Sequence, residues 1–272
     1  MTNTLAFASH GVAAKLTWSG LPPTRDWREY LLGLLPPGAA VGPAGQSDSA
    51  APRWAGRITG EGGDYTFSST GTGGGEWTTS DSDELDHLIE SGIGMGIAEL
   101  SPEAVFVHAG VVGTPCGAVM IPGRSFAGKT TLVRALLQAG CSYLSDEYAV
   151  VTSQGLVAPY PRRLSIRTGS GRERPTARDL SAHEGAAMPV AVVLRVRYQP
   201  GAELELAPLS QGHLALALID NAVAAQVRPR EVSHACATVA RSAAGFDGVR
   251  GEAEAAAAAI LSLVCPEARV LK

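Results

Sequence analysis

A phosphate-binding pattern, G-x-x-x-x-G-K-[ST], constrains this chain more than any other stretch. It appears as GRSFAGKT, followed by a second threonine. Its two glycines permit backbone angles that a side chain would forbid, so successive N–H groups can point at phosphate oxygens. The lysine supplies a positive charge for the terminal phosphates, and the threonine supplies a hydroxyl that Mg²⁺ can bind. The pattern predicts a nucleotide site formed by Gly123, Arg124, Ser125, Phe126, Ala127, Gly128, Lys129, Thr130 and Thr131.

The sequence around this motif matters, because a chain with 32 glycines can match the pattern by chance. A phosphate loop needs a strand before it and a helix after it. Residues 117–121 are apolar and predict a short buried strand. Apolar residues between Leu132 and Ala139 recur at helical spacing, and Gly140 follows where a helix-ending glycine belongs. Both neighbours therefore support nucleotide phosphate binding.

Two acidic residues, Asp146 and Glu147, follow the predicted helix at the end of an apolar segment. In phosphate-loop proteins an acid near this position either coordinates Mg²⁺ or accepts a proton from the attacking group. The spacing from Lys129 predicts that the strand at residues 143–147 lies alongside the strand at 117–121. The alternative interpretation is that both acids are exposed turn residues.

Two further sets of residues are candidates with a plain structural alternative. His108 interrupts a hydrophobic strand at residues 105–112, so it is either a hydrogen-bonded core residue or a catalytic one. Arg162 and Arg163 begin an arginine-rich segment, and guanidinium groups suit phosphate or carboxylate recognition. The alternative for the arginines is a solvated loop. We expect these two to contact the substrate, because the Pro-Tyr-Pro sequence at 159–161 stiffens their approach.

Charge is unevenly distributed along the chain. The net charge of −4 argues against a general nucleic-acid binder. Residues 1–100 carry five basic and twelve acidic side chains, whereas residues 101–272 carry 17 basic and 14 acidic ones. The basic half is the one with the phosphate loop, as expected for a region that binds anions.

The four cysteines are widely separated, at positions 116, 141, 236 and 265. Their spacing gives no zinc-site pattern and predicts buried thiols in a reducing compartment. The N-terminus lacks a signal-type segment, and no apolar run reaches transmembrane length. We therefore expect a cytoplasmic protein that does not partner a membrane.

Residues 1–100 form a separate N-terminal α+β region in this interpretation. It is expected to be an add-on layer, with substrate recognition as the alternative role. Paired strands are predicted at 5–10 with 13–18 and at 53–59 with 64–69, helices at 27–35 and 81–91, and a loop at 38–52. After the acidic pair we expect a hairpin at 149–159, strands at 190–197 and 203–209, an edge strand at 246–249, and helices at 210–221, 232–244 and 252–264.

The order of these features resembles a known family. A histidine-bearing strand, a phosphate loop, a helix ending in Ala-Gly and the segment Leu-Ser-Asp-Glu look like the catalytic domain of bacterial HPr kinase/phosphorylase. They look still more like the HPr-kinase-related proteins found without the HPr system. The resemblance covers residues 104–167 well. It implies an α/β fold in which residues 101–272 form a P-loop domain of the HPr kinase/phosphoenolpyruvate carboxykinase type.

The resemblance also implies roles for individual residues. Members of the family use ATP and Mg²⁺ to phosphorylate a serine hydroxyl. By this resemblance Asp146 accepts the hydroxyl proton, Glu147 and Thr130 hold the metal, Lys129 holds phosphate, and His108 assists. Two departures stand out: no second Gly-rich signature is recognisable after Arg167, and Phe126 replaces a glycine usual in the loop. The first argues against HPr as the substrate and against the reverse phosphorolysis.

These features predict a kinase that transfers a phosphoryl group from ATP to a hydroxyl, expected to be a serine in a peptide, protein or small molecule. One alternative is a regulatory or assembly module that binds ATP without useful turnover. Another is a carboxykinase-like or nucleotide-hydrolysing enzyme. The sequence leaves open the acceptor, a donor other than ATP, the reverse reaction, whether a homo-oligomer forms, and the role of residues 1–100.

Overall fold

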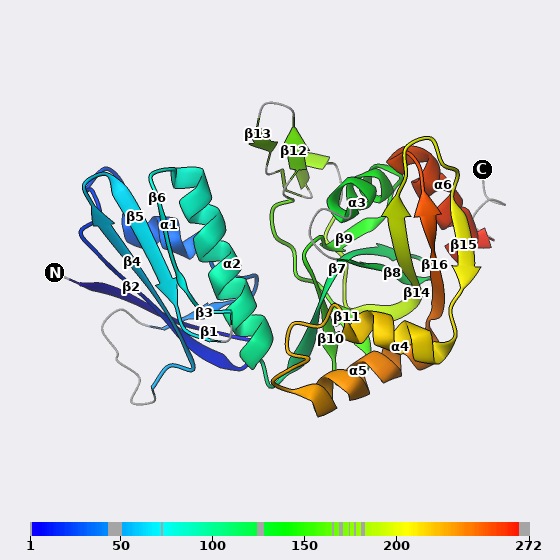
Figure 1. The fold of residues 1–272 in the computed structure, drawn as a ribbon, viewed down its shortest axis with the longest axis horizontal. Helices are drawn as coiled ribbons and strands as arrows, with labels where there is room; N and C mark the ends of the chain where they lie inside the picture. The colour runs from blue at the N-terminus through cyan, green and yellow to red at the C-terminus, as the bar shows by residue number, and fades with distance from the viewer. Residues whose placement is uncertain are drawn as a thin grey trace. The chain divides into compact units, whose positions relative to one another are not determined.

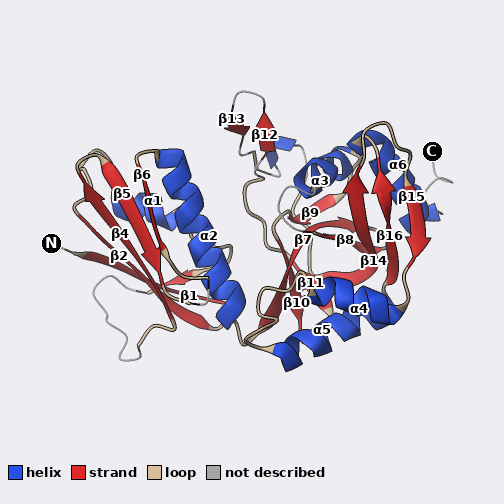
Figure 2. Cartoon of the chain, viewed as in Figure 1, coloured by secondary structure: helices blue, strands red, loops and turns tan. Residues whose placement is uncertain are grey.

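The computed structural model of the 272-residue chain describes residues 2–42, 51–71, 73–123, 128–164, 166–168, 171–173, 175–176, 178–180 and 183–266. Within these ranges the chain is mixed α/β, with helices and two mixed β-sheets, which confirms the predicted α/β class. The chain divides into two compact units, residues 1–104 and residues 105–272. Figure 1 and Figure 2 show the elements of each unit.

The first unit contains a six-stranded sheet in the order β3-β1-β2-β4-β5-β6 (Figure 1). Neighbouring strands are antiparallel, except that β2 and β4 run parallel. Every second residue of β2 is buried, which is the period of a strand with one covered face. The strands are β1 (Asn3–Ser9), β2 (Val12–Ser19), β3 (Ala40–Val41), β4 (Trp54–Glu61), β5 (Asp64–Ser69) and β6 (Glu76–Thr79).

Helix α2 (Ser82–Leu100) packs against β4, β5 and β6 of this sheet. Two glycines, Gly92 and Gly96, allow the close approach. A Cβ atom at the first would collide with the ring of Phe67, and a Cβ at the second would collide with the ring of Trp54. Both rings are buried, so the glycines let the helix contact the largest apolar side chains of the unit.

Most of the N-terminal elements match the sequence predictions. Both predicted hairpins are present, as β1–β2 and β4–β5. The helix predicted at 27–35 is α1 (Trp27–Leu32), and the one predicted at 81–91 is the longer α2. The sequence did not predict the edge strands β3 and β6, because they are short and mostly exposed and so carry little hydrophobic pattern. Of the predicted loop at 38–52, residues 43–50 lie outside the described residues.

The second unit contains an eight-stranded sheet in the order β11-β10-β7-β8-β14-β16-β15, with β9 paired to β7 off this path. Strands β8, β14 and β16 run parallel to one another, whereas β7 and β15 are antiparallel to their neighbours β8 and β16. The strands are β7 (Ala104–Thr114), β8 (Gly117–Pro122), β9 (Ser142–Ser145), β10 (Tyr148–Thr152), β11 (Leu156–Ala158), β14 (Met188–Tyr198), β15 (Glu205–Pro208) and β16 (Ala244–Arg250). A separate two-stranded sheet joins β12 (Ile166–Thr168) to β13 (Gly171–Glu173).

Helices cover both faces of the larger sheet (Figure 1 and Figure 2). Val119 and Ile121 of β8 belong to the core under α3 and α6, whereas Ala118 and Met120 belong to the core under α4 and α5. This alternation is why the sequence of β8 is a continuous apolar run. The helices are α3 (Lys129–Gln138), α4 (Gln211–Ile219), α5 (Pro229–Ser242) and α6 (Ala253–Val264). None of the helices in the described ranges is both long and apolar enough to cross a lipid bilayer.

Two predicted strand positions are wrong. The strand that leads to the acidic pair does not lie beside β8: it is β9, which pairs with β7. Strands β7 and β8 form a local hairpin, so β7 takes one edge of β8 and β14 takes the other. The segment predicted as an edge strand at 246–249 is part of β16, which lies inside the sheet between β14 and β15.

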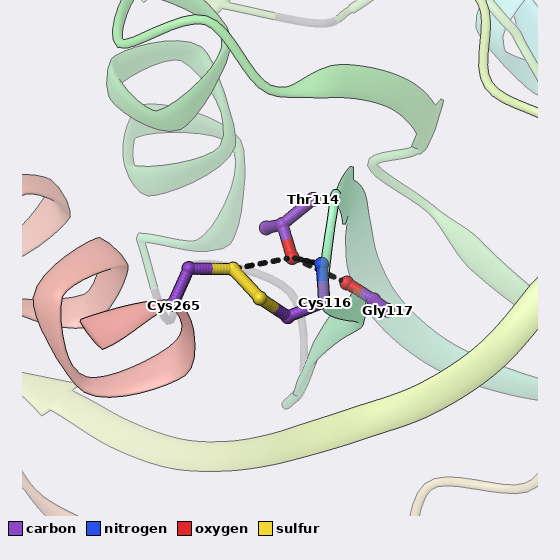
Figure 3. Close-up of a disulfide and its surroundings, with 4 residues drawn as sticks. All are labelled: Thr114, Cys116, Gly117 and Cys265. Atoms are coloured by element: carbon purple, nitrogen blue, oxygen red, sulfur yellow. Dashed lines mark hydrogen bonds between the residues drawn. A yellow bond between two sulfur atoms is a disulfide. The ribbon is translucent and has the colours of Figure 1, made fainter. Parts of the chain in front are cut away.

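The cysteine prediction is also wrong in part. Cys116, in the turn between β7 and β8, forms a disulfide with Cys265, directly after α6 (Figure 3). The two residues are 149 positions apart, and only the packing of α6 on the sheet brings them together, so their spacing carried no signal. Cys141 and Cys236 are free and buried, as predicted. Since disulfides persist in oxidising compartments, the cysteines no longer support the cytoplasmic prediction.

Candidate functional site

The site is built at the start of α3, where the phosphate-loop motif ends. Gly128 has φ +75°, a left-handed conformation that favours glycine, and it turns the chain into the helix. Among the described residues, no side chain caps this helix end. Four residues of the predicted loop, at positions 124–127, lie outside the described residues. The described part of the motif is Gly123, Gly128, Lys129, Thr130 and Thr131.

Lys129 lies in the first turn of α3 and is half-buried. Its Nζ donates a hydrogen bond to the carbonyl oxygen of Gly123 at 2.7 Å, which joins the two ends of the loop. Burial lowers the pKa of the ammonium from its ordinary value, and the carboxylates of Asp146 and Glu147 oppose this change. The lysine is therefore a cation that faces both predicted acids.

Asp146 contacts the first turn of α3. It lies between β9 and β10, is 8% exposed, and is therefore not the exposed turn residue of the alternative interpretation. Its Oδ2 accepts a hydrogen bond from Thr130 Oγ1 at 3.3 Å. The structure thus brings a predicted metal-binding hydroxyl and a predicted proton acceptor into contact.

Tyr143 supports Asp146 from β9 and was not predicted. Its ring is fully buried, and its hydroxyl lies 2.9 Å from Asp146 Oδ1 and 2.9 Å from the carbonyl oxygen of Arg162. A single hydroxyl proton can be donated to only one of them at a time. Burial, followed by the Asp146 carboxylate, raises the pKa of Tyr143 well above its ordinary value. The phenol therefore keeps its proton and can donate it in a hydrogen bond. The available sequence signal was a tyrosine on the predicted strand, three residues before the acid.

Glu147 and Arg162 form an ion pair, with Arg162 NH1 2.7 Å from Glu147 Oε2. The arginine side chain is 11% exposed and that of the glutamate 33%. The Glu147 carbonyl oxygen also accepts the backbone N–H of Ala109, which fixes the residue to β7. The predicted metal ligand and the predicted substrate-binding arginine are thus partners of each other, whereas Arg163 is exposed.

His108 lies on β7, where its ring packs against a core tyrosine and its carbonyl oxygen contacts the phosphate-loop motif. Its ring centroid is 4.8 Å from that of Tyr148, and its carbonyl oxygen accepts the Gly123 N–H at 3.1 Å. Burial lowers the pKa of the imidazole, the nearby Glu147 carboxylate opposes this, and Lys129 lowers it further. The residue therefore anchors the first glycine of the loop and presents a neutral ring at pH 7.

Arg250 is a second residue of the site that the sequence did not predict. It ends β16, is 3% exposed, and donates from NH2 to the carbonyl oxygen of Gly128 at 2.9 Å. Its guanidinium carbon lies 5.2 Å from the ring centroid of Tyr198, at the end of the neighbouring strand β14. Ligands of α/β sheets bind at the carboxyl ends of parallel strands. An arginine at the end of a strand that runs parallel to the phosphate-loop strand was the available signal.

Comparison of the chain with protein-family models and with curated proteins found no match. We therefore infer function from the residues of the site. Within the described ranges there is no group of three or more His, Cys, Asp and Glu residues placed to hold a metal. A single carboxylate and a hydroxyl, as in Asp146 and Thr130, are nevertheless a donor set that Mg²⁺ uses together with substrate phosphates. The arrangement can hold an anion at the start of α3 and accept a proton beside it.

Proposed function

We propose that the chain is an ATP- and Mg²⁺-dependent phosphotransferase that moves the γ-phosphoryl group of ATP to a hydroxyl, namely a serine of a peptide, protein or small molecule. The observation that carries this proposal is the contact between Thr130 and Asp146 beside Lys129. These residues lie 16 positions apart, and the acid is held by a second hydrogen bond from Tyr143. An acid, a hydroxyl and a lysine together at a helix start are the groups that phosphoryl transfer uses.

We further infer that residues 101–272 adopt the P-loop fold of the HPr kinase/phosphoenolpyruvate carboxykinase type. The support is the resemblance over residues 104–167, together with the strand, glycine turn and helix around the motif. The His108 strand and the acid-bearing turn between β9 and β10 flank the start of that helix, in the order that the resemblance implies.

In the proposed reaction Lys129 and the backbone amides of the loop hold the phosphates. Asp146 accepts the proton of the acceptor hydroxyl, whose oxygen bonds to the γ-phosphorus. The bond between that phosphorus and the β–γ bridging oxygen breaks, and ADP leaves with the bridging oxygen. Tyr143 orients the carboxylate through Oδ1. Positioning and charge neutralisation account for most of the rate in this chemistry.

The metal would be held by Thr130 and one acid of the Asp146–Glu147 pair. Glu147 is the ligand that the sequence predicts, but the Thr130 contact favours Asp146 because Glu147 is paired with Arg162. When bound, Mg²⁺ supplies charge neutralisation on the β- and γ-phosphate oxygens. His108, neutral at pH 7, can donate a hydrogen bond without adding a charge to the site.

The test combines nucleotide binding with phosphoryl transfer on the full chain. We expect ATP with Mg²⁺ to raise the melting temperature, and radiolabelled γ-phosphate to appear on at least one member of a panel of serine, seryl peptides and small alcohols. Lys129→Met should lower transfer by roughly 100-fold, since it removes one charge from the transition state. Arg134→Met, on the same helix, is the matched control and should keep both activities. Binding without transfer to any acceptor would instead indicate a regulatory module.

A further inference from the structure

Arg250 carries a positive charge that is buried at the start of α3. The side chain spans the end of β16 and the phosphate loop: NH2 donates to the Gly128 carbonyl oxygen at 2.9 Å, and NH1 donates to that of Gly251 at 2.8 Å. Residues 128 and 250 are 122 positions apart, so this contact is made only by the fold. Both acceptors are neutral carbonyl groups, which satisfy donors but do not balance the charge.

No carboxylate within the described ranges lies at ion-pair distance from Arg250. The nearest acidic influences are Glu252 and Glu254, and burial outweighs both in lowering the pKa of the guanidinium. Glu252 is engaged elsewhere, because its Oε1 accepts the Tyr198 hydroxyl at 2.8 Å. Buried charges in proteins are normally paired, so a buried cation without a carboxylate partner among these residues points to an anion from outside the chain.

The guanidinium also occupies the space beside the loop glycine. A Cβ atom built on Gly128 would lie 2.6 Å from Arg250 NH2. Gly128 is therefore required twice, for its positive φ and for the space that the arginine fills. Because Lys129 and Thr130 follow directly, the arginine fixes the turn from which both residues extend.

Tyr198 holds the guanidinium in place from β14. Its ring lies 5.2 Å from the Arg250 guanidinium carbon, and its hydroxyl is fixed by Glu252. The parallel pairing of β14 with β16 places these two strand ends side by side. The arginine is thus oriented by a rigid pair of strands rather than by a loop.

We propose that Arg250 is a positioning residue for the phosphates of the nucleotide, one that sets the Gly128 turn and keeps a buried positive charge for a bound polyphosphate to neutralise. This inference rests on the proposed function for the identity of the ligand. It assigns to the C-terminal end of β16 a role that the phosphate-loop motif does not contain.

The experiment compares Arg250→Met and Arg250→Lys with wild type. The probes are inorganic tripolyphosphate, ATP, AMP and adenosine, and the readouts are the ligand-induced shift in melting temperature and the KM for ATP. Arg195 is the matched control, since it lies on β14, pairs with Asp247 of β16 at the surface, and is 48% exposed. Arg195→Met and Arg195→Lys are expected to behave as wild type.

We expect Arg250→Met to weaken binding of tripolyphosphate and ATP by roughly 10-fold or more, because the variant loses both the hydrogen bond that sets the Gly128 turn and the positive charge beside it. Binding of AMP should change less and binding of adenosine least, because the effect follows the ligand's charge. Most of the loss should appear in KM rather than kcat, and Arg250→Lys should recover part of it. If Arg250→Met fails to fold, Arg250→Lys, which keeps the charge, is the test. Its KM for ATP should be higher than that of wild type, and an unchanged KM would count against the inference.

Equal losses for all four ligands, or a melting shift with tripolyphosphate that survives in Arg250→Met, would show a merely structural role and overturn the inference. The outcome for phosphoryl transfer is separate. If wild type binds tripolyphosphate through Arg250 but transfers no phosphoryl group, the role of Arg250 stands and the kinase proposal fails. If transfer occurs and Arg250→Met binds and reacts as wild type, the kinase proposal stands and Arg250 has no such role.

Discussion

Two regions meet at the start of α3, and their charged side chains differ in the partners that they have. On one side, the turn between β9 and β10 brings acids whose partners are in the chain: Asp146 contacts Thr130 and Tyr143, and Glu147 pairs with Arg162. On the other side, the end of β16 brings Arg250, which contacts only carbonyl oxygens and a ring among the described residues. The acids have cations within the chain, since Arg162 pairs with Glu147 and Lys129 attracts both acids, whereas we infer that Arg250 keeps its charge for a ligand. A polyphosphate would supply the missing anion, and the acidic side would then receive the acceptor's proton.

The largest effect is expected when the acidic side is broken at its proton acceptor. Asp146→Asn keeps the size of the side chain and one of its two acceptor oxygens, but its amide nitrogen only donates and the group cannot take a proton at neutral pH. We expect phosphoryl transfer to fall by about 1000-fold, while the melting shift that ATP causes without Mg²⁺ survives, because Lys129 and the loop amides are the groups proposed to hold the phosphates. Initial rates and thermal shifts on the same preparation measure both. Tyr143→Phe, which leaves the carboxylate in place, is the control, and an Asp146→Asn variant as active as Tyr143→Phe would assign the proton transfer elsewhere.

The basic side is broken at Gly128. Gly128→Ala introduces a Cβ at φ +75° and 2.6 Å from Arg250 NH2. We expect a loss of about 2–3 kcal/mol in the free energy of unfolding, measured by urea denaturation. Gly140→Ala is a matched control, because that glycine has φ +98° but a Cβ added to it would meet no described atom within 4 Å. It should lose only about 1–2 kcal/mol.

Adding Arg250→Met to Gly128→Ala separates the two causes. The double variant should regain part of the stability lost in Gly128→Ala. The methyl group that Gly128→Ala adds clashes with the guanidinium of Arg250, and Arg250→Met removes that guanidinium. A double variant that is no more stable than Gly128→Ala would show that the backbone angle alone makes glycine necessary.

A smaller effect is expected at the partly buried pair of Glu147 and Arg162. Its side chains are 33% and 11% exposed, so solvent screens the attraction only in part. A double-mutant cycle with Glu147→Gln and Arg162→Met should give a coupling of about 1 kcal/mol in the free energy of unfolding. The same cycle on Arg195 and Asp247, an exposed pair, should give less. A coupling near zero would show that the ion pair between Glu147 and Arg162 does not stabilise the folded chain.

The smallest effect is a pH dependence from His108. Burial lowers the pKa of this imidazole in the folded chain, so the unfolded chain binds more protons as the pH falls through the unfolded value of 6.5. Folded-state stability should therefore decline between pH 7 and pH 5, and the decline should be shallower in His108→Gln. His234→Gln, at an exposed position on α5, is the control and should keep the wild-type slope. Urea denaturation at several pH values measures this, and identical slopes in all three proteins would contradict it.

Much of the fold was predictable because local patterns set it. The β1–β2 hairpin, the strand and helix around the loop, and the helices after residue 210 all follow from apolar period and glycine position. The predictions that depended on which elements lie next to each other in the fold were wrong. The place of β9 beside β7, the interior position of β16, and the Cys116–Cys265 disulfide depend on which strands and helices meet across the sheet.

The candidate site divides in the same way. The sequence by itself determined that Gly128, Lys129 and Thr130 begin a helix and that an acid follows at the end of the next apolar segment, because these are matters of backbone angle and short spacing. Only the tertiary structure decided that Tyr143 supports that acid, that Glu147 pairs with Arg162, and that Arg250 reaches Gly128 from 122 residues away. The physical reason is that contact between distant residues is set by strand order and helix packing, which no single segment of the chain specifies.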